Sequence, residues 1–141
     1  WLYLDSVRDP GNLGSMLRAA DWFGLKNIAL SPASADPYNP KVVRGGMGAH
    51  FHLNVHRDIP LNDLKKSGKK IIAAVQDSTP ISELDVKESE DWCLVMGSEA
   101  DGISEKSRSL ADQFVSIPGT GEAESLNVAV ATGILLYQLT N

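Results

Sequence analysis

Short, predominantly apolar runs recur along this chain and alternate with segments of helical periodicity. The runs occupy residues 2–4, 28–30, 71–75, 93–96 and 114–117, and a polar residue, Gly or Pro follows each one. Strands with little polar face are typical of sheets that are buried on both sides. Strands that alternate with helices favour parallel pairing. The pattern therefore predicts an α/β domain with a mostly parallel sheet flanked by helices.

The same patterns predict where individual elements begin and end. A helix is expected over residues 13–23, where apolar residues recur at helical spacing before a glycine stop. Residues 51–55 alternate apolar and polar side chains, as a strand does. Ser104 is expected to cap a short helix. The most apolar helix is expected over residues 126–139, with Ser125 at its start.

Composition limits the class of protein. The chain has 141 residues, of which 43% are hydrophobic and 22% charged, and this is ordinary for one globular domain. No apolar run approaches the ~18 residues of a membrane span. Cys93 is the single cysteine and cannot form an internal disulfide, which predicts a reducing compartment, the cytoplasm. With no internal repeat and no linker, residues 1–141 are expected to form one domain.

The charge is distributed unevenly. Residues 1–57 hold six basic and four acidic side chains, a net charge of +2, whereas the remainder holds seven basic and fourteen acidic ones, a net charge of −7. The overall charge of −5 argues against nucleic-acid binding by bulk charge. Any polyanionic partner is therefore expected to meet the N-terminal half.

Three predicted strand ends are rich in Gly and polar residues, and ligands of parallel sheets bind outside such ends. Asn12, Glu99, Ser125 and Asn127 are the polar side chains that these loops present. Each also has a purely structural interpretation. Asn12 and Ser125 are good helix caps, and Glu99 between glycines could be a solvated turn residue. Asn127 is expected in the first turn of an apolar helix, where a buried amide must find partners.

Other candidate sites are weaker. His50, His52 and His56 lack the Cys or HExxH partners of a metal site, so no metal is expected. Cys93 lies among apolar residues and is expected in the core rather than as a nucleophile. The glycines at 45–48 are not followed by the Lys-Ser/Thr of a phosphate loop, so dinucleotide binding is not expected.

Three segments resemble the SpoU (TrmH-like) family of RNA 2′-O-ribose methyltransferases, part of the SPOUT superfamily. The first is LDSVRDPGNLG at residues 4–14, followed by RAA and FG. The second is LVMGSE at residues 94–99, followed by GIS. The third is IP at 117–118, followed by SLNVAVA at 125–131. Each motif is modest alone, but three in the family's order and spacing are highly specific, and together they span nearly the whole chain.

The resemblance implies a fold, a cofactor and an assembly. The C-terminal segment of the sheet would thread through a loop as a deep trefoil knot, which periodicity could not have predicted. The loops of the knot would bind S-adenosylmethionine (AdoMet), leaving S-adenosylhomocysteine as the product, and no metal is implied. Members of the family act as homodimers with the active site near the subunit interface. Many relatives carry an N-terminal RNA-binding domain, which is expected to be absent from this chain.

The resemblance also implies site residues. The implied catalytic residues are Asn12, Arg18, Glu99, Ser125 and Asn127. The implied cofactor-binding residues, whose backbone and side chains would line one pocket, are Ala74, Val75, Gln76, Met96, Gly97, Ile117, Pro118, Ser125 and Leu126. A guanidinium is a poor base because its pKa exceeds 12, so Arg18 is expected to hold an RNA phosphate in a bidentate pair. Glu99 is expected to orient Asn12 or Arg18.

The function implied by the resemblance is AdoMet-dependent methylation of a ribose 2′-hydroxyl in tRNA or rRNA. One alternative is a non-catalytic RNA-binding module on the same scaffold. A second is an AdoMet enzyme with a small-molecule substrate, which the acidic balance fits slightly better and the motifs fit worse.

Overall fold

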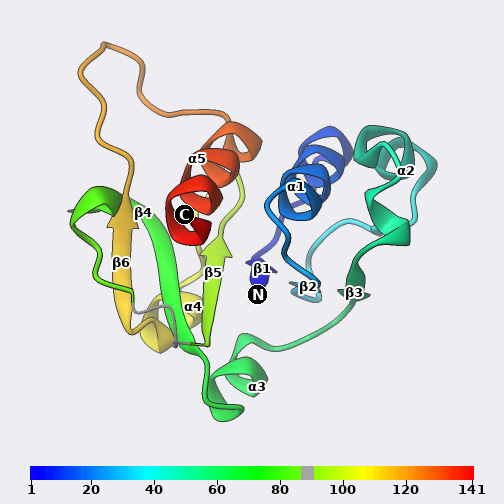
Figure 1. The fold of residues 1–141 in the computed structure, drawn as a ribbon, viewed down its shortest axis with the longest axis horizontal. Coiled ribbons are helices and arrows are strands. Elements are labelled where there is room, and N and C mark those ends of the chain that lie inside the picture. Colours follow the sequence, from blue (N-terminus) through cyan, green and yellow to red (C-terminus); the bar gives the residue numbers. More distant parts are fainter. Residues whose placement is uncertain (87–90) are drawn as a thin grey trace.

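A computed structural model describes residues 1–86 and 91–141. It contains one parallel sheet with the strand order β3-β2-β1-β5-β4-β6 (Figure 1). The strands are β1 (Leu2–Leu4), β2 (Asn27–Leu30), β3 (Asn54–His56), β4 (Lys70–Pro80), β5 (Trp92–Met96) and β6 (Gln113–Ser116). The helices are α1 (Pro10–Trp22), α2 (Pro40–Gly46), α3 (Leu61–Lys66), α4 (Glu105–Leu110) and α5 (Val128–Thr140), with 3-10 turns η1 (Ala49–Phe51) and η2 (Ile81–Glu83). The predicted α/β class is confirmed.

Alternate residues of each strand enter two separate cores. Leu2 and Leu4 of β1 pack with Leu13 and Leu17 of α1 on one face, whereas Tyr3 faces the opposite core. The first core also receives α2 and α5, and the second receives α3, Ile103 before α4 and Leu110 at the end of α4. Both faces of the sheet are therefore covered, which explains why its strands lack a polar side. No helix of the described residues is long and apolar enough to span a membrane.

Several predicted boundaries are wrong. The first helix begins at Pro10, three residues earlier than its apolar periodicity suggests, because Asp9 caps it and Pro is favoured in the first turn. Residues 51–55 are not one strand: η1 ends at Phe51, and β3 covers only Asn54–His56. The alternation there is too short to distinguish a strand from a tight turn.

Strand β4 extends beyond its predicted end. The strand was expected to stop at Val75, but it continues to Pro80 with a shift of register against β6 between Ala74 and Thr79. Ala74, Val75 and Gln76 therefore lie at an irregularity within a strand rather than at its end. Such irregularities re-aim side chains and interrupt backbone pairing, and they are frequent beside functional sites.

Between β6 and α5 the chain makes a long excursion without regular structure, residues 117–127, drawn in orange in Figure 1. It returns to place α5 against α1 on the same face of the sheet. The trefoil knot implied by the resemblance stays a prediction.

Candidate active site at the carboxyl edge of the sheet

A crevice opens where the chain leaves two neighbouring strands in opposite directions. After β1 it enters α1 on one face of the sheet, and after β5 it enters α4 on the other. Ligands of open parallel sheets bind at such points. A cavity of about 170 Å³ lies there. It is lined by Ser6, Val7, Arg8, Asp9, Asn12, Ser98, Glu99, Ala100, Asp101 and Val128.

The side chain of Asn127 joins the loops around this cavity. Its Nδ2 donates to Asn12 Oδ1 at 3.0 Å and to Glu99 Oε1 at 3.0 Å. Its Oδ1 accepts the backbone N–H groups of Ala129 at 2.9 Å and Val130 at 3.2 Å. The two oxygen contacts fix the orientation of the amide, because only the nitrogen side can then donate. One side chain thus uses its full hydrogen-bonding capacity to connect three segments that are far apart in sequence.

Asn127 does not lie where the sequence placed it. It is the N-cap of α5 and is exposed, whereas a buried position inside the first turn was expected. The predicted cap, Ser125, lies two residues earlier in an exposed part of the 117–127 segment. Both residues are good caps, so propensity could not choose between them. The contacts to Asn12 and Glu99 distinguish Asn127.

The capping interpretation of Asn12 is also wrong. Asp9 is the N-cap of α1, and its Oδ1 accepts the Asn12 N–H at 2.8 Å. Asn12 is therefore inside the first turn, and its side chain is free to meet Asn127. Because Asn12 Oδ1 accepts from Asn127, the Asn12 Nδ2 group points elsewhere. No hydrogen bond to that Nδ2 is found within residues 1–86 and 91–141.

Glu99 contacts a different partner from the two that were expected. It was expected to orient Asn12 or Arg18, but its Oε1 accepts from Asn127, so it acts on Asn12 through a shared neighbour. Arg18 lies further along α1, is exposed, and forms no hydrogen bond or ion pair with any described residue. Of the five implied catalytic residues, the structure brings Asn12, Glu99 and Asn127 together, and it leaves Arg18 and Ser125 outside that cluster.

The turn after β5 is shaped by close backbone packing. A Cβ built on Gly97 would lie 2.1 Å from the carbonyl carbon of Gly102 and 2.3 Å from Ile103 N, so no side chain fits. Ser98 and Gly102 exchange two backbone hydrogen bonds across this turn, at 3.1 and 2.9 Å. Gly102 has φ +66°, a region that glycine enters without strain. The turn therefore holds Glu99 in a fixed position at the edge of the cavity.

The implied cofactor-binding residues lie in three segments beside this turn. Met96 is buried at the end of β5, and Ile117 is half-buried after β6. Gln76 Nε2 donates to the Glu124 carbonyl at 3.0 Å, which joins the irregular part of β4 to the 117–127 segment. Pro118 and Leu126 are exposed within that segment. None of these residues lines the 170 Å³ cavity.

Several residues at this edge were not singled out from the sequence. Ser6 and Arg8 line the cavity. Asp5 is buried, and its Oδ2 accepts the Ser104 N–H at 2.8 Å, which ties the end of β1 to the cap of α4. The sequence signal that could have identified Asp5 is a carboxylate placed directly after a buried strand.

Cys93 is a core residue, as predicted. It lies in β5 with no exposed surface, and burial raises the pKa of its thiol to about 12. Tyr3 lies on the same face of the sheet, and burial raises its pKa to about 12 as well, with the Asp5 charge adding to the effect. Neither group contacts the cavity residues, so neither is a candidate nucleophile.

The three histidines go to three different places. His50 Nε2 lies 2.7 Å from the Pro37 carbonyl, and His52 Nδ1 lies 2.9 Å from Asp21 Oδ2. His56 stacks on Trp1 with a ring separation of 5.2 Å. Across the described part of the chain, no group of three His, Cys, Asp or Glu side chains is arranged to hold a metal ion.

Comparison with known proteins gives matches over almost the whole chain. The family model of the SpoU rRNA Methylase family matches residues 1–137. A relative from Bacillus subtilis, the 23S rRNA (guanosine(2553)-2′-O)-methyltransferase RlmP, is 41% identical over 142 residues, which cover 98% of this chain and 56% of the relative. A 23S rRNA (uridine(2479)-2′-O)-methyltransferase from Streptomyces viridochromogenes is 33% identical, covering 95% of this chain and 50% of its own length.

Solved structures match equally well. The SpoU methyltransferase AviRb from Streptomyces viridochromogenes, in complex with AdoMet, superposes with a TM-score of 0.87 at 30% identity, covering 99% of this chain and 58% of that chain. An AdoMet-bound rRNA methyltransferase from Sinorhizobium meliloti gives a TM-score of 0.89 at 33% identity, covering 97% and 54%. This chain spans little more than half the length of these relatives.

Proposed function

Because this chain belongs to the SpoU rRNA methylase family, we propose that it transfers a methyl group from AdoMet to a ribose 2′-hydroxyl of ribosomal or transfer RNA. The observation that carries the proposal is the Asn12–Asn127–Glu99 cluster beside the cavity. Residues 1–141 would form the catalytic domain of this activity, acting in the cytoplasm. RNA binding by the whole protein, and the identity of the RNA, belong to the same proposal.

The cluster has the polarity that a hydroxyl requires. A hydroxyl both donates and accepts hydrogen bonds. Asn12 Nδ2 is a donor, and Glu99 Oε2 is an acceptor, and neither is bonded to another described residue, since Asn127 contacts the other atom of each group. The two free atoms therefore suit a ribose 2′-hydroxyl, with Asn12 donating to its oxygen and Glu99 accepting its hydrogen. Asn127 keeps both groups oriented and is a positioning residue.

The segments around β4, β5 and β6 suit AdoMet. Ala74 is the last residue before the register shift against β6, and the shift leaves backbone groups of Val75 and Gln76 without regular pairing to β6, available for a ligand. The Gln76–Glu124 bond brings the 117–127 segment, with Ile117 and Leu126, to the same edge. The tight turn at Gly97 lies between these segments and the cavity. When bound, AdoMet supplies a methyl group that its sulfonium sulfur already activates.

Arg18 would serve the RNA rather than the cofactor. Its guanidinium is exposed and unpaired within the described residues, and it follows Asn12 on α1 by six positions. A guanidinium stays protonated and matches a phosphate in a bidentate geometry. The proton that the 2′-hydroxyl shares with Glu99 would then pass to a phosphate of the bound RNA or to a water held beside it. In-line placement of that oxygen against the methyl–sulfur bond would contribute to the rate enhancement.

Homodimer formation belongs to the same proposal. Val130, Ile134 and Tyr137 of α5 are 52, 39 and 60% exposed, and with the preceding Leu126 at 49% they form one stripe of helical spacing. Leu135 and Leu136 of the same helix are buried in the core and lie outside this stripe. An exposed apolar stripe of this kind marks a surface that another chain covers. Leu126 connects the stripe to the proposed AdoMet loops.

Two measurements test the proposal. Isothermal titration calorimetry of residues 1–141 with AdoMet should show saturable binding. Incubation with methyl-labelled AdoMet and unmodified 23S rRNA, 16S rRNA or tRNA should place label on ribose 2′-oxygens, mapped by resistance to alkaline cleavage. Binding without transfer to any of these RNAs would support the non-catalytic RNA-binding alternative. A complete absence of AdoMet binding would refute the proposed methyltransferase activity.

A further inference from the structure

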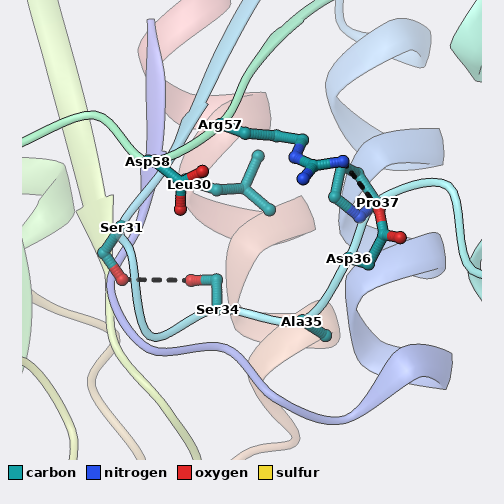
Figure 2. A pocket seen from close by; sticks show the side chains of 8 residues that line it. All are labelled: Leu30, Ser31, Ser34, Ala35, Asp36, Pro37, Arg57 and Asp58. Carbon is teal, nitrogen blue, oxygen red and sulfur yellow. Dashed lines mark hydrogen bonds and ion pairs between the residues drawn. The ribbon is translucent and has the colours of Figure 1, made fainter.

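A second crevice lies beside the first on the same edge of the sheet. After β2 the chain enters α2 on one face, and after β3 it enters α3 on the other, so these strands also diverge at their carboxyl ends. A cavity of about 120 Å³ lies between them. Figure 2 shows the residues that line it, which are Leu30, Ser31, Ser34, Ala35, Asp36, Pro37, Arg57 and Asp58. Nothing in the proposed function uses this cavity.

The two cavities are about one nucleoside apart. The first lies between β1 and β5 and the second between β2 and β3, and the strand order separates these midpoints by two strand spacings, or about 10 Å. The second cavity is small, since pockets that enclose drug-sized ligands measure ~300–1,000 Å³. Its size therefore suits a flat base rather than a whole nucleotide.

A chain of hydrogen bonds connects the two cavities. Ser6, which lines the first, donates its N–H to Ser31 Oγ at 2.8 Å. Ser34 Oγ donates to the Leu4 carbonyl at 3.0 Å, so the 3.1 Å contact between Ser31 and Ser34 must have Ser31 as the donor (Figure 2). Both hydroxyls are thereby committed to the protein. They hold the second cavity rigidly against the loop after β1.

The remaining polar groups differ in how they are paired. Asp36 Oδ1 accepts from the Tyr38 N–H at 2.9 Å and from Arg57 Nη1 at 3.4 Å (Figure 2). This pair places a guanidinium at the cavity, whose lining also includes the apolar Leu30 and Pro37. Asp58 has no hydrogen bond or ion pair with the residues that the structure describes. Its exposed carboxylate is therefore an acceptor that remains for a ligand, as is Oδ2 of Asp36, whose two hydrogen bonds both end on Oδ1.

These groups select a base over a phosphate. Two carboxylates against one guanidinium give the cavity a net negative charge, which repels phosphate. Unpaired bases of RNA stack on guanidinium planes and are read through their Watson–Crick edges. Guanine presents two adjacent donors there, N1–H and N2–H, which match the two oxygens of a carboxylate. On the same edge, adenine and cytosine each have an acceptor beside the donor, and uracil has an acceptor on either side of its donor.

We propose that the crevice between β2 and β3 receives the base of the nucleotide to be methylated, and that the Asp58 carboxylate selects guanine. The inference rests on the proposed function, because it places the ribose of that nucleotide at the Asn12–Glu99 pair. Arg57 stacks on the base, and the Ser31–Ser34 chain sets the distance between the two cavities. Asp58 is thereby a specificity-determining residue.

The test is a titration that does not depend on methyl transfer. Guanosine and uridine are added separately to ¹⁵N-labelled protein, and the backbone amides of Ser31, Ser34 and Asp58 are followed by NMR. Guanosine should shift these amides in a saturable way, about ten- to a hundredfold more tightly than uridine. Asp58→Asn keeps the shape of the side chain and suits its left-handed backbone (φ +54°), but it should lose this preference. Asp63→Asn, an exposed change on α3, is the matched control and should keep it.

The outcomes separate this inference from the proposed function. If guanosine leaves the three amides unmoved, or if Asp58→Asn binds it as the unchanged protein does, the base site is refuted, whether or not RNA is methylated. If guanosine binds there but calorimetry shows no AdoMet binding, the methyltransferase proposal fails and a guanine site remains. Equal responses to guanosine and uridine would also overturn the selection by Asp58.

Discussion

The side-chain amide of Asn127 donates to Asn12 Oδ1 at 3.0 Å, although 115 residues separate the two along the chain. The same nitrogen reaches Glu99, and the amide oxygen caps α5. Asn127 therefore combines a structural role, starting a helix, with a positioning role, orienting two groups at the cavity. Substitutions can separate these roles, because the amide oxygen serves the first and the amide nitrogen serves the second.

The Asn127→Asp variant should be more stable than the Asn127→Ala variant. Both variants should lose methyl transfer to the same extent. Aspartate caps a helix as asparagine does, whereas alanine forfeits a cap of about 1 kcal/mol. The new carboxylate has no donor for Asn12 and repels Glu99. Urea denaturation and a methyl-transfer assay measure the two effects. Adding Glu99→Gln to Asn127→Asp should restore part of the stability by removing the repulsion, and an additive double mutant would contradict this coupling.

Arg18→Ala should lower the rate of RNA methylation by about a hundredfold or more while leaving AdoMet affinity and thermal stability nearly unchanged. The reason is that Arg18 is exposed and forms no hydrogen bond or ion pair with the described residues that the substitution would remove. Lys26→Ala removes another exposed cation, beyond the end of α1, and is the matched control. If both substitutions lowered the methylation rate equally, Arg18 would contribute only through the overall charge of the protein.

Gly97→Ala should destabilise the fold by about 3 kcal/mol, because the added Cβ would lie too close to backbone atoms of Gly102 and Ile103, which would have to shift. Gly133→Ala is the control. A Cβ there meets no atom within 4 Å, and alanine in a helix interior is favoured by about 1 kcal/mol. Urea denaturation of both variants should therefore give shifts of opposite sign. A mild effect at Gly97 would show that the turn after β5 can open.

Ile134→Glu should convert a dimer into a monomer in sedimentation equilibrium, because it places a charge in the middle of the α5 stripe. Val43→Glu provides the comparison: Val43 is exposed to nearly the same extent, 43% against 39%, but lies on α2. The Val43 variant should remain dimeric. A monomeric parent protein at micromolar concentration would remove the dimer from the proposal.

Stability should fall as pH rises above about 8.5, where an exposed thiol begins to ionise. Burial raises the pKa of Cys93 to about 12, so the native state keeps its proton while the unfolded state loses it. The unfolding free energy should decrease by up to roughly 1 kcal/mol per pH unit in this range. Below pH ~8.5 the contribution of the buried Cys93 thiol to the unfolding free energy is fully present. Cys93→Ala should show a shallower dependence in urea titrations between about pH 8 and about pH 10.

Thiol labelling gives an independent check on Cys93. A disulfide reagent such as dithionitrobenzoate should leave the native thiol unmodified and react stoichiometrically after denaturation. Fast labelling of the native protein would show that β5 opens readily.

Local patterns in the sequence predicted the class of fold, the core of every strand of the sheet except β3, and the family. Apolar runs, a helical repeat and ordered motifs are local patterns, and burial on both faces of a sheet leaves a local trace in composition. The sequence also identified Asn12, Glu99 and Asn127 as polar residues at strand ends.

The use that the protein makes of these residues followed from contacts between segments that are distant in sequence. The N-terminal end of α1 and the identity of the α5 cap depended on which side chain reached a partner, and Asp9 and Asn127 prevailed over equally good local candidates. The second cavity could not be predicted either, because Ser31 and Asp58 belong to loops that are adjacent only once β2 and β3 pair. Hydrogen bonds between distant segments depend on three-dimensional proximity, which local propensity does not encode.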